Sequence, residues 1–180
     1  MACIFFAALF VSGNTYTQTT EPAEPAAAAI KAAYLYKFGN FVHWPARSQD
    51  TTGKVFTIGI ISEDGLADEL KKIVAGRSVM GLPVVIRKLR TGDPMGGINV
   101  LFVGRSHNSH LADILAAVKG KATLTVTESD KGLELGGMIN FVTIDGKLRF
   151  EVAPKAAELE SIAISARLLA AAYKVAVWLS

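Results

Sequence analysis

The sequence predicts an α/β protein: a three-layer α/β/α sandwich with a mixed, mainly parallel sheet and a C-terminal antiparallel hairpin. Three observations lead to this fold class. β-Branched apolar runs alternate with segments of helical periodicity, which is typical of βα units in a parallel sheet. Helical segments at both ends of the chain are available to cover the two apolar faces of such a sheet. Near the C-terminus an Asp-Gly pair joins two apolar runs, which indicates a hairpin.

The length favours a single domain with a short N-terminal appendage. The chain has 180 residues, of which 51% are hydrophobic and 19% charged, so it can build one core without a metal or a disulfide. We divide it into a signal peptide and tether at 1–25 and one domain at 26–180. The apolar run 2–11 has the length of a signal peptide's hydrophobic region and is too short to cross a bilayer. A buried N-terminal strand is the alternative.

The single cysteine bears on the compartment. Cys3 lies inside the apolar run, so the mature domain would contain no cysteine. Disulfides, thiol catalysis and thiolate metal sites are then excluded from the mature domain. We expect a periplasmic protein that is stabilised by packing alone.

The first half of the domain predicts a helix, a strand and a second helix. Residues 26–42 place apolar side chains at helical spacing. The β-branched run 54–61 predicts a buried strand. Ser62 is expected to cap the next helix, which ends at Gly76.

The middle of the chain predicts a second βα unit. Residues 82–89 and 98–103 indicate two strands, and a turn-rich segment separates them. Ser106 or Ser109 is expected to cap the helix that follows, and the run 122–126 predicts the next strand.

The C-terminal third predicts the hairpin and a long final helix. The runs 138–144 and 147–152 flank the Asp-Gly pair at 145–146, whose expected type I′ turn makes the two strands antiparallel. A helix is expected to begin at Pro154 and to continue to Tyr173 with one apolar stripe.

Charge and loop chemistry argue against nucleic acid and nucleotide binding. The net charge is only +3 and the basic residues are spread along the chain, so no basic stripe for nucleic acid is present. Glu63 and Asp64 follow the first strand, where a dinucleotide-binding fold would carry its glycine-rich phosphate loop. These carboxylates would repel a phosphate.

The remaining reactive side chains do not form a familiar catalytic motif. His107 and His110 are spaced to share one helical face, but no third metal ligand has a useful spacing, and exposed turn histidines are the simpler interpretation. Serine nucleophiles of α/β hydrolases lie in a G-x-S-x-G turn, which is absent from the sequence. We therefore expect neither an enzyme nor a cofactor.

An ordered set of short motifs resembles the YfiR-like family. The resemblance covers roughly residues 27–176, and its specificity lies in the order of the motifs. They are AYLYKF at 33–38, FVHWP at 41–45, INVLFV at 98–103, LTV at 124–126, GGMINF at 136–141, LRFEV at 148–152 and ISARLL at 164–169.

The resemblance implies a periplasmic, non-enzymatic regulator. The best-known member of the family represses an inner-membrane diguanylate cyclase by binding its periplasmic sensor domain, and an outer-membrane lipoprotein relieves this repression by sequestering the repressor. That repressor carries disulfides that tune its activity. This chain has no matching cysteines, so redox control of that kind is not expected here.

A regulator of this kind needs an exposed surface for its partner, and aromatic and arginine side chains usually dominate such contacts. We expect the surface near the end of the first helix and around the glycine pair before the hairpin. The candidate partner-binding residues are Tyr36, Phe41, Trp44, Arg105, Gly136, Gly137, Met138 and Arg149.

Two alternatives stay open at this point. The aromatic residues of the first helix could belong to the core, and Gly136-Gly137 could simply be the tight turn that leads into the hairpin. The protein could also be a small-ligand module in which Arg105, at the end of a parallel strand, binds an anion or another metabolite. A homodimer is compatible with either function.

Overall fold

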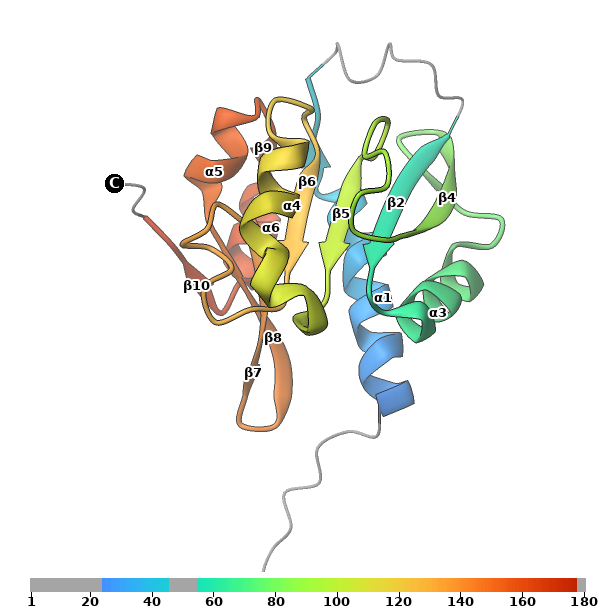
Figure 1. Ribbon diagram of the computed structural model, residues 1–180, viewed down its shortest axis with the longest axis horizontal. Coiled ribbons are helices and arrows are strands. Elements are labelled where there is room, and N and C mark those ends of the chain that lie inside the picture. Colours follow the sequence, from blue (N-terminus) through green and yellow to red (C-terminus); the bar gives the residue numbers. More distant parts are fainter. Residues whose placement is uncertain (1–23, 46–54, 178–180) are drawn as a thin grey trace, which may run out of the picture.

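A mixed sheet of eight strands forms the centre of the described part of the molecule, residues 24–45 and 55–177 of this computed structural model (Figure 1). The five central strands run parallel, and the hairpin and one edge strand add antiparallel pairs. In spatial order the strands are β10 (Lys174–Val175), β8 (Lys147–Val152), β7 (Ile139–Ile144), β6 (Leu124–Thr127), β5 (Val100–Val103), β2 (Phe56–Ile61), β4 (Leu82–Leu89) and β3 (Ser78–Val79).

Helices cover both faces of this sheet, which confirms the predicted α/β class. In Figure 1, α4 lies in front of the sheet and α1 behind it. Apolar side chains of α1 and α3, such as Phe38 and Leu70, belong to the larger core cluster, and those of α4, such as Leu115, belong to a separate smaller cluster. These helices are α1 (Glu24–Asn40), α3 (Asp64–Val74) and α4 (Leu111–Val118), with the 3₁₀ helix η1 (Arg105–His110) leading into α4.

The hairpin of β7 and β8 has the predicted turn. Asp145 and Gly146 have φ angles of 50° and 69°, as a type I′ turn requires at its two central positions. The register pairs Ile144 with Lys147 next to the turn and Ile139 with Val152 at the other end.

The predicted helix from Pro154 to Tyr173 is wrong. The segment forms two helices, α5 (Pro154–Leu159) and α6 (Ala166–Ala171), with the short strand β9 (Ala163–Ile164) between them. Pairing with a distant strand overrides the helical periodicity, because β9 is antiparallel to β1 (Val42–His43). Ser161, at a φ of 58°, lies in the turn that follows α5, and the Ser165 hydroxyl accepts a hydrogen bond from Leu168 N at the start of α6.

The predicted serine caps are also wrong. The residue that precedes α3 is Glu63, and Ser62 lies just outside the helix with a φ of 71°. Ser106 and Ser109 lie within η1, and α4 follows His110 without a side-chain cap. The Ser62 hydroxyl contacts His107 instead, and the hydroxyls of Ser106 and Ser109 each contact the ring of the histidine that follows them.

The expected signal peptide and Cys3 lie outside the described residues, and both stay predictions. The first helix begins at Glu24, two residues before the predicted start of the domain at 26. None of the helices within residues 24–45 and 55–177 has the length and apolar character of a membrane span.

Candidate functional site

Three charged side chains follow three neighbouring parallel strands at the same edge of the sheet. Glu63 comes two residues after β2, Arg105 two residues after β5, and Glu128 directly after β6. The chain passes from β2 to β4 on one side and then returns to β5 on the other side of β2, so the strand order reverses here. Ligands of open α/β sheets bind at such a reversal, at the carboxyl ends of the strands.

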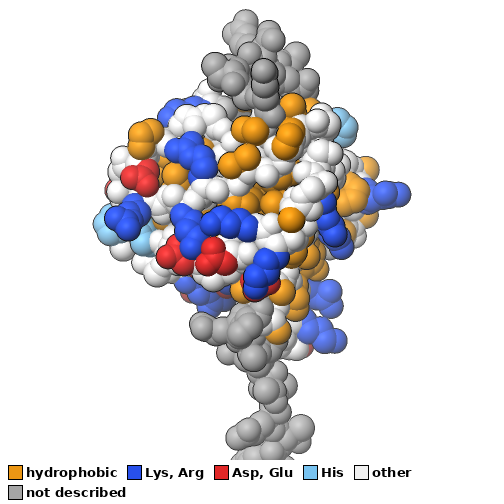
Figure 2. Space-filling view, turned by 90° about the vertical axis from the view of Figure 1, so that its right-hand side faces the viewer, with side chains coloured by type: hydrophobic (Ala, Val, Ile, Leu, Met, Phe, Trp, Pro, Cys, Tyr) orange, Lys and Arg blue, Asp and Glu red, His pale blue; other side chains and the backbone are white. Residues whose placement is uncertain are grey.

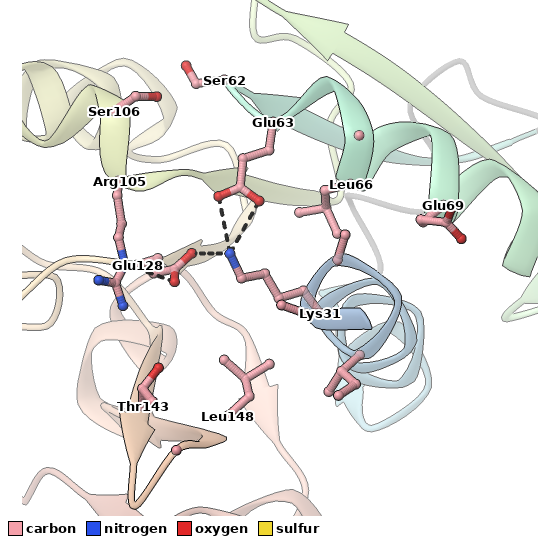
Figure 3. A pocket seen from close by; sticks show the side chains of 15 residues that line it. Lys31, Ser62, Glu63, Leu66, Glu69, Arg105, Ser106, Glu128, Thr143 and Leu148 are labelled. Atoms are coloured by element: carbon pink, nitrogen blue, oxygen red, sulfur yellow. Dashed lines mark hydrogen bonds and ion pairs between the residues drawn. The ribbon is translucent and has the colours of Figure 1, made fainter. Parts of the chain in front are cut away.

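A cavity of about 800 Å³ lies at this edge (Figure 3). Its walls come from the N-terminal part of α1, the start of α3, the η1 segment and the β7–β8 hairpin. Apolar side chains and hydroxyl groups accompany the charged residues: Ile30, Leu66 and Leu148 are lining residues, as are Ser62 and Ser106. The cavity therefore combines apolar walls with a charged interior.

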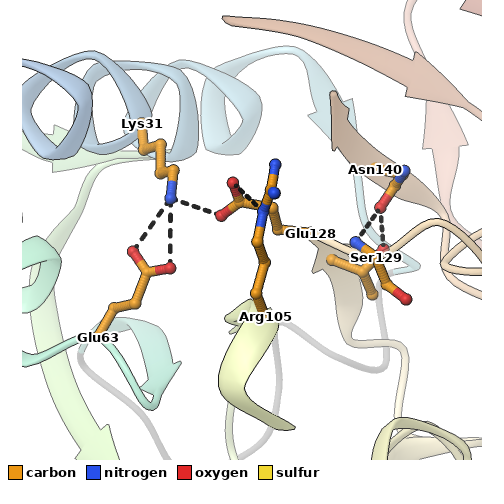
Figure 4. A network of polar contacts seen from close by, with 7 residues as sticks. Lys31, Glu63, Arg105, Glu128, Ser129 and Asn140 are labelled. Atoms are coloured by element: carbon orange, nitrogen blue, oxygen red, sulfur yellow. Dashed lines mark hydrogen bonds and ion pairs between the residues drawn. The ribbon is translucent and has the colours of Figure 1, made fainter. Parts of the chain in front are cut away.

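Lys31 of α1 links the two carboxylates inside the cavity (Figure 4). Its Nζ donates to both carboxylate oxygens of Glu63, at 3.2 and 3.3 Å, and to Oε2 of Glu128 at 2.5 Å. Arg105 Nε donates to the other oxygen of Glu128 at 2.9 Å. Side-chain exposure is 13% for Lys31, 25% for Glu63 and 6% for Glu128, so the network is largely removed from water.

Burial has an electrostatic consequence for Glu63. Loss of solvent raises the pKa of the Glu63 carboxyl above its ordinary value, and this effect outweighs the stabilisation of the anion by Lys31. The neighbouring Glu128 carboxylate also raises it. Glu128 is also bonded to Arg105, whereas Glu63 has only Lys31 as a cationic partner among the described residues. Ionisation of Glu63 is therefore the less favourable of the two.

The two neighbours of Glu128 in the chain, Thr127 and Ser129, are held in place by Asn140, a buried polar residue of β7. Oδ1 of Asn140 accepts hydrogen bonds from Thr127 Oγ1 at 2.8 Å and from Ser129 N at 3.0 Å. Gly132 lies against Asn140, because a Cβ atom there would come within 2.4 Å of Oδ1 of that side chain. The segment around Glu128 thus requires glycine for close approach.

The histidines form a separate rim feature. The Ser62 hydroxyl contacts Nδ1 of His107, and the rings of His107 and His110 are 6.2 Å apart. No carboxylate bonds to His107 in the described part of the chain, so nothing there orients the ring as a catalytic base. Within residues 24–45 and 55–177, no group of three His, Cys, Asp or Glu side chains is arranged to hold a metal ion.

The structure corrects the expected exposure of two predicted site residues. Trp44 is only 5% exposed and packs edge-on against Phe56, with ring centroids 5.3 Å apart. Met138 is 3% exposed, and its backbone N–H donates to Thr125 Oγ1. Both side chains belong to the larger core cluster. For Trp44 this agrees with the alternative that the aromatic residues near the first helix belong to the core.

The glycine pair before the hairpin has two different roles. Gly136 is exposed and has a φ of 98°, a conformation that favours glycine. Gly137 is buried, and a Cβ there would lie 2.7 Å from the carbonyl oxygen of Gly132. The two glycines therefore allow the chain after Glu128 to fold back so that Gly137 packs against Gly132.

The other predicted site residues remain accessible but do not share one surface. Arg105 lines the cavity, with 63% of its side chain exposed, and Arg149 is exposed on β8. Tyr36 and Phe41 are half-buried near the C-terminal end of α1, and each has an arginine over its ring. The guanidinium carbon of Arg77 is 5.5 Å from the Tyr36 centroid, and that of Arg167 is 5.9 Å from the Phe41 centroid.

Sequence reasoning missed Lys31 and Glu128, which hold the network together. Lys31 lies in an alanine-rich stretch of the first helix, and its partners are 32 and 97 residues away. One signal was available for Glu128, because it follows the apolar run of β6 directly, just as Glu63 and Arg105 follow β2 and β5.

The comparisons with known proteins give one family and a general likeness of fold. Residues 28–173 match the model of a family described as YfiR/HmsC-like. A crystal structure of a conserved domain protein from Vibrio cholerae O1 biovar El Tor is similar, with a TM-score of 0.51 and 14% identity over 68% of this chain and 55% of that one. The ABC domain in complex with L-Trp from Streptococcus pneumonia gives a TM-score of 0.53 and 15% identity over 83% of this chain and 60% of that one.

At these identities the two structures show the fold alone. The chain spans 55% and 60% of their lengths, so a large part of each of those proteins has no counterpart in this chain. No curated protein matches the sequence.

Proposed function

The chain belongs to the YfiR/HmsC-like family, and on this premise we propose that it is a non-enzymatic regulator in cyclic-di-GMP signalling that represses a membrane-bound sensor protein. It does so in the periplasm, by occupying the periplasmic sensor domain of an inner-membrane protein that is a diguanylate cyclase. The family match over residues 28–173 carries this proposal, because it covers nearly the whole described domain. An outer-membrane lipoprotein is the proposed partner that relieves repression.

The two aromatic–arginine pairs near the C-terminal end of α1, Tyr36 with Arg77 and Phe41 with Arg167, support a partner-binding role. Tyr36 and Phe41 are half-buried, so their rings are held in place by the fold while part of each stays accessible. Arg77 and Arg167 lie over these rings and are exposed. Fixed aromatic and arginine side chains lose little conformational freedom on binding and are the commonest energetic centres of protein interfaces.

Deletion of the gene and affinity measurements test this proposal together. Loss of the protein is expected to raise cyclic-di-GMP and surface attachment. A pull-down from solubilised membranes with the full chain then identifies the sensor. Replacing Tyr36 or Phe41 by alanine is expected to weaken binding of its periplasmic domain about thirtyfold, as truncation of an interface anchor does.

Tyr173 supplies the matched control for these variants. The residue is 55% exposed and directly precedes the edge strand β10, so Tyr173→Ala is expected to keep normal affinity. Unchanged cyclic-di-GMP after deletion, together with the absence of a membrane sensor from the pull-down, would overturn the proposed function.

Small-ligand binding is a second candidate function, which the cavity at the strand reversal favours. Arg105 uses Nε for Glu128, and its terminal guanidinium nitrogens have no bonded partner within the described residues. They are free to bind a carboxylate or another anion. Native mass spectrometry after incubation with a periplasmic metabolite extract is expected to show a retained small molecule with the full chain and not with Arg105→Ala. Retention by neither protein would remove this candidate.

A further inference from the structure

One edge of the main sheet is open along most of β4. On its inner side β4 pairs with β2 from Val84 to Leu89. On its outer side β3 pairs only with the start of β4, Ser78 with Pro83 and Val79 with Leu82. In the described ranges no strand covers β4 beyond this point. An uncovered edge presents backbone donors and acceptors in a row and is a template for another strand.

The backbone groups that face this open edge can be assigned. Val84 N donates to the carbonyl oxygen of Arg77, on the outer side of β4. Backbone groups alternate between the two sides of a strand, so those of Ile86 and Lys88 also point outward. An added strand would pair with these two residues.

A groove lies beside the open edge, between β4 and the C-terminal end of α3. Its volume is about 450 Å³. Val84 and Ile86 of β4 form one wall, and Val74 at the end of α3 forms part of the other. Side chains of a strand added to β4 alternate in direction, so every second one would enter this groove.

Hydrophobic side chains also reach the surface around this edge. Val85 is 39% exposed and Met80, in the turn between β3 and β4, is 49% exposed. Figure 2 shows the right-hand side of the view in Figure 1, where hydrophobic side chains lie among Lys, Arg, Asp and Glu side chains. Lys88 does not protect the edge as a free charge, because Asp68 of α3 holds it at 3.1 Å.

The charge of the groove indicates what it binds. Its charged lining residues are Lys71 and Arg77, and no acidic residue lines it. Lys71 has only a loose contact with Asp68, at 3.5 Å with both side chains more than half exposed. Arg77 stacks on Tyr36 and forms no ion pair within the described residues. The groove is therefore positive as well as apolar.

From these observations we infer that the open edge of β4 binds an extended, acidic segment of the partner protein by strand addition. The segment pairs with Ile86 and Lys88, places an apolar side chain in the groove, and directs a carboxylate two residues away to Lys71 and Arg77. This inference rests on the proposed function and specifies how the partner is recognised. It also joins the edge to Tyr36, whose ring lies under Arg77 and whose hydroxyl donates to Ser78 O at 3.3 Å.

A synthetic peptide tests the inference on the full chain. The probe is an octapeptide with blocked ends. Threonine stands at every second position, and the positions between hold valine and glutamate alternately, so that valine and glutamate share one face of the extended peptide. Fluorescence anisotropy is expected to show binding, and hydrogen exchange at saturation is expected to slow at the Ile86 and Lys88 amides. The same peptide with lysine in place of glutamate should bind at least about tenfold more weakly. Equal binding of the two peptides, or protection elsewhere in the molecule, would refute strand addition at β4.

Variants separate the backbone and charge contributions. Ile86→Pro removes an outward N–H that β2 does not use, and it is expected to abolish peptide binding. Because Ile86 also packs against the core, the charge reversals Lys71→Glu and Arg77→Glu provide a test that leaves the core intact. Each is expected to weaken the glutamate peptide by about tenfold and to strengthen the lysine peptide. Lys119→Glu, at the end of α4, is the matched control and should change neither affinity.

Failure of this inference is distinguishable from failure of the proposed function. If the full chain captures and represses a membrane sensor while both Glu variants retain normal affinity for that sensor, the β4 edge is not the recognition surface. If the peptide binds at β4 but deletion leaves cyclic-di-GMP unchanged, the edge binds acidic segments and the proposed regulatory role is wrong.

Discussion

Lys31 on the first helix and Glu128 beyond β6 form an ion pair in which the side chains are 13% and 6% exposed. The pair connects the helix layer to the carboxyl edge of the sheet. Removing one member of a buried ion pair leaves an uncompensated charge, which costs more than the pair itself contributes.

The variant Lys31→Met is therefore expected to lower the free energy of unfolding at neutral pH by about 3–5 kcal/mol. The loss should shrink as the pH falls, because protonation removes the unpaired carboxylate charge. Urea denaturation at a series of pH values measures both effects. Lys155→Met, in an exposed pair with Glu158 at 3.3 Å, is the control and should stay within about 0.5 kcal/mol of wild type. Equal effects of the two variants would show that the buried network has no special role.

Glu63 predicts a pH dependence with a definite sign. Burial raises the pKa of its carboxyl above 4.5, so the folded protein binds this proton more tightly than the unfolded chain does. Its contribution to stability is present below pH 4.5 and is lost as the pH rises through the raised pKa. The unfolding free energy of wild type minus that of Glu63→Gln should therefore decrease as the pH rises from 4.5 through the raised pKa of Glu63.

Asp68→Asn provides the opposite sign. The hydrogen bond from Lys88 lowers the pKa of the exposed Asp68 carboxyl below 3.8, so its contribution is present above that pH and is lost as the pH falls further. Chemical denaturation of the three proteins between pH 3 and pH 7 should show the two contrary trends. A Glu63→Gln difference that is independent of pH would contradict the stated effect of burial.

The hairpin turn predicts a strain effect at Gly146. Its φ is 69°, and a Cβ atom there would contact nothing within 4 Å, so a substitution acts only through the backbone. Gly146→Val is expected to destabilise the protein by about 1–3 kcal/mol. Gly65→Ala, which also has open space and lies in the first turn of α3 at an ordinary φ, should be neutral or stabilise by up to about 1 kcal/mol. Denaturation midpoints that shift alike would argue against backbone strain.

Trp44 separates core packing from partner binding. Because its ring is buried against Phe56, Trp44→Ala is expected to lower the free energy of unfolding by about 3–5 kcal/mol. Affinity for the partner, corrected for the folded fraction, should be unchanged. The melting temperature and the partner affinity of the variant, measured on the same preparation, distinguish a core role from a binding role. A normal melting temperature with weakened binding would show that Trp44 contacts the partner.

Local patterns predicted the fold where local interactions determine it. The Asp-Gly turn at 145–146 favours the β7–β8 hairpin, and the β-branched run that contains 56–61 favours a buried strand, which the structure has there. The segment 154–173 shows the limit of this approach. Its apolar stripe is real, but β9 gains backbone partners from β1, which no window of sequence contains.

The candidate site was harder to predict for the same reason. Its parts come from α1, β2, β5 and β6, and only the parallel order of those strands brings them together. Arg105 was identified from its place after a strand. Lys31 has no neighbour in the sequence that indicates its two carboxylate partners, so its role became visible only when the helix was placed against the sheet edge.

The pairing of β1 with β9 also determines when the molecule can be completed. Val42 pairs with Ile164, and Ser165 N donates to the carbonyl oxygen of Phe41, so the end of the first helix obtains its backbone partners from the last part of the chain. A nascent chain that stops before residue 163 lacks those partners, however much of the sheet has formed. Forming this pair therefore requires a contact between segments far apart in the sequence, and contacts of that kind form more slowly than the local contacts of a helix or a hairpin.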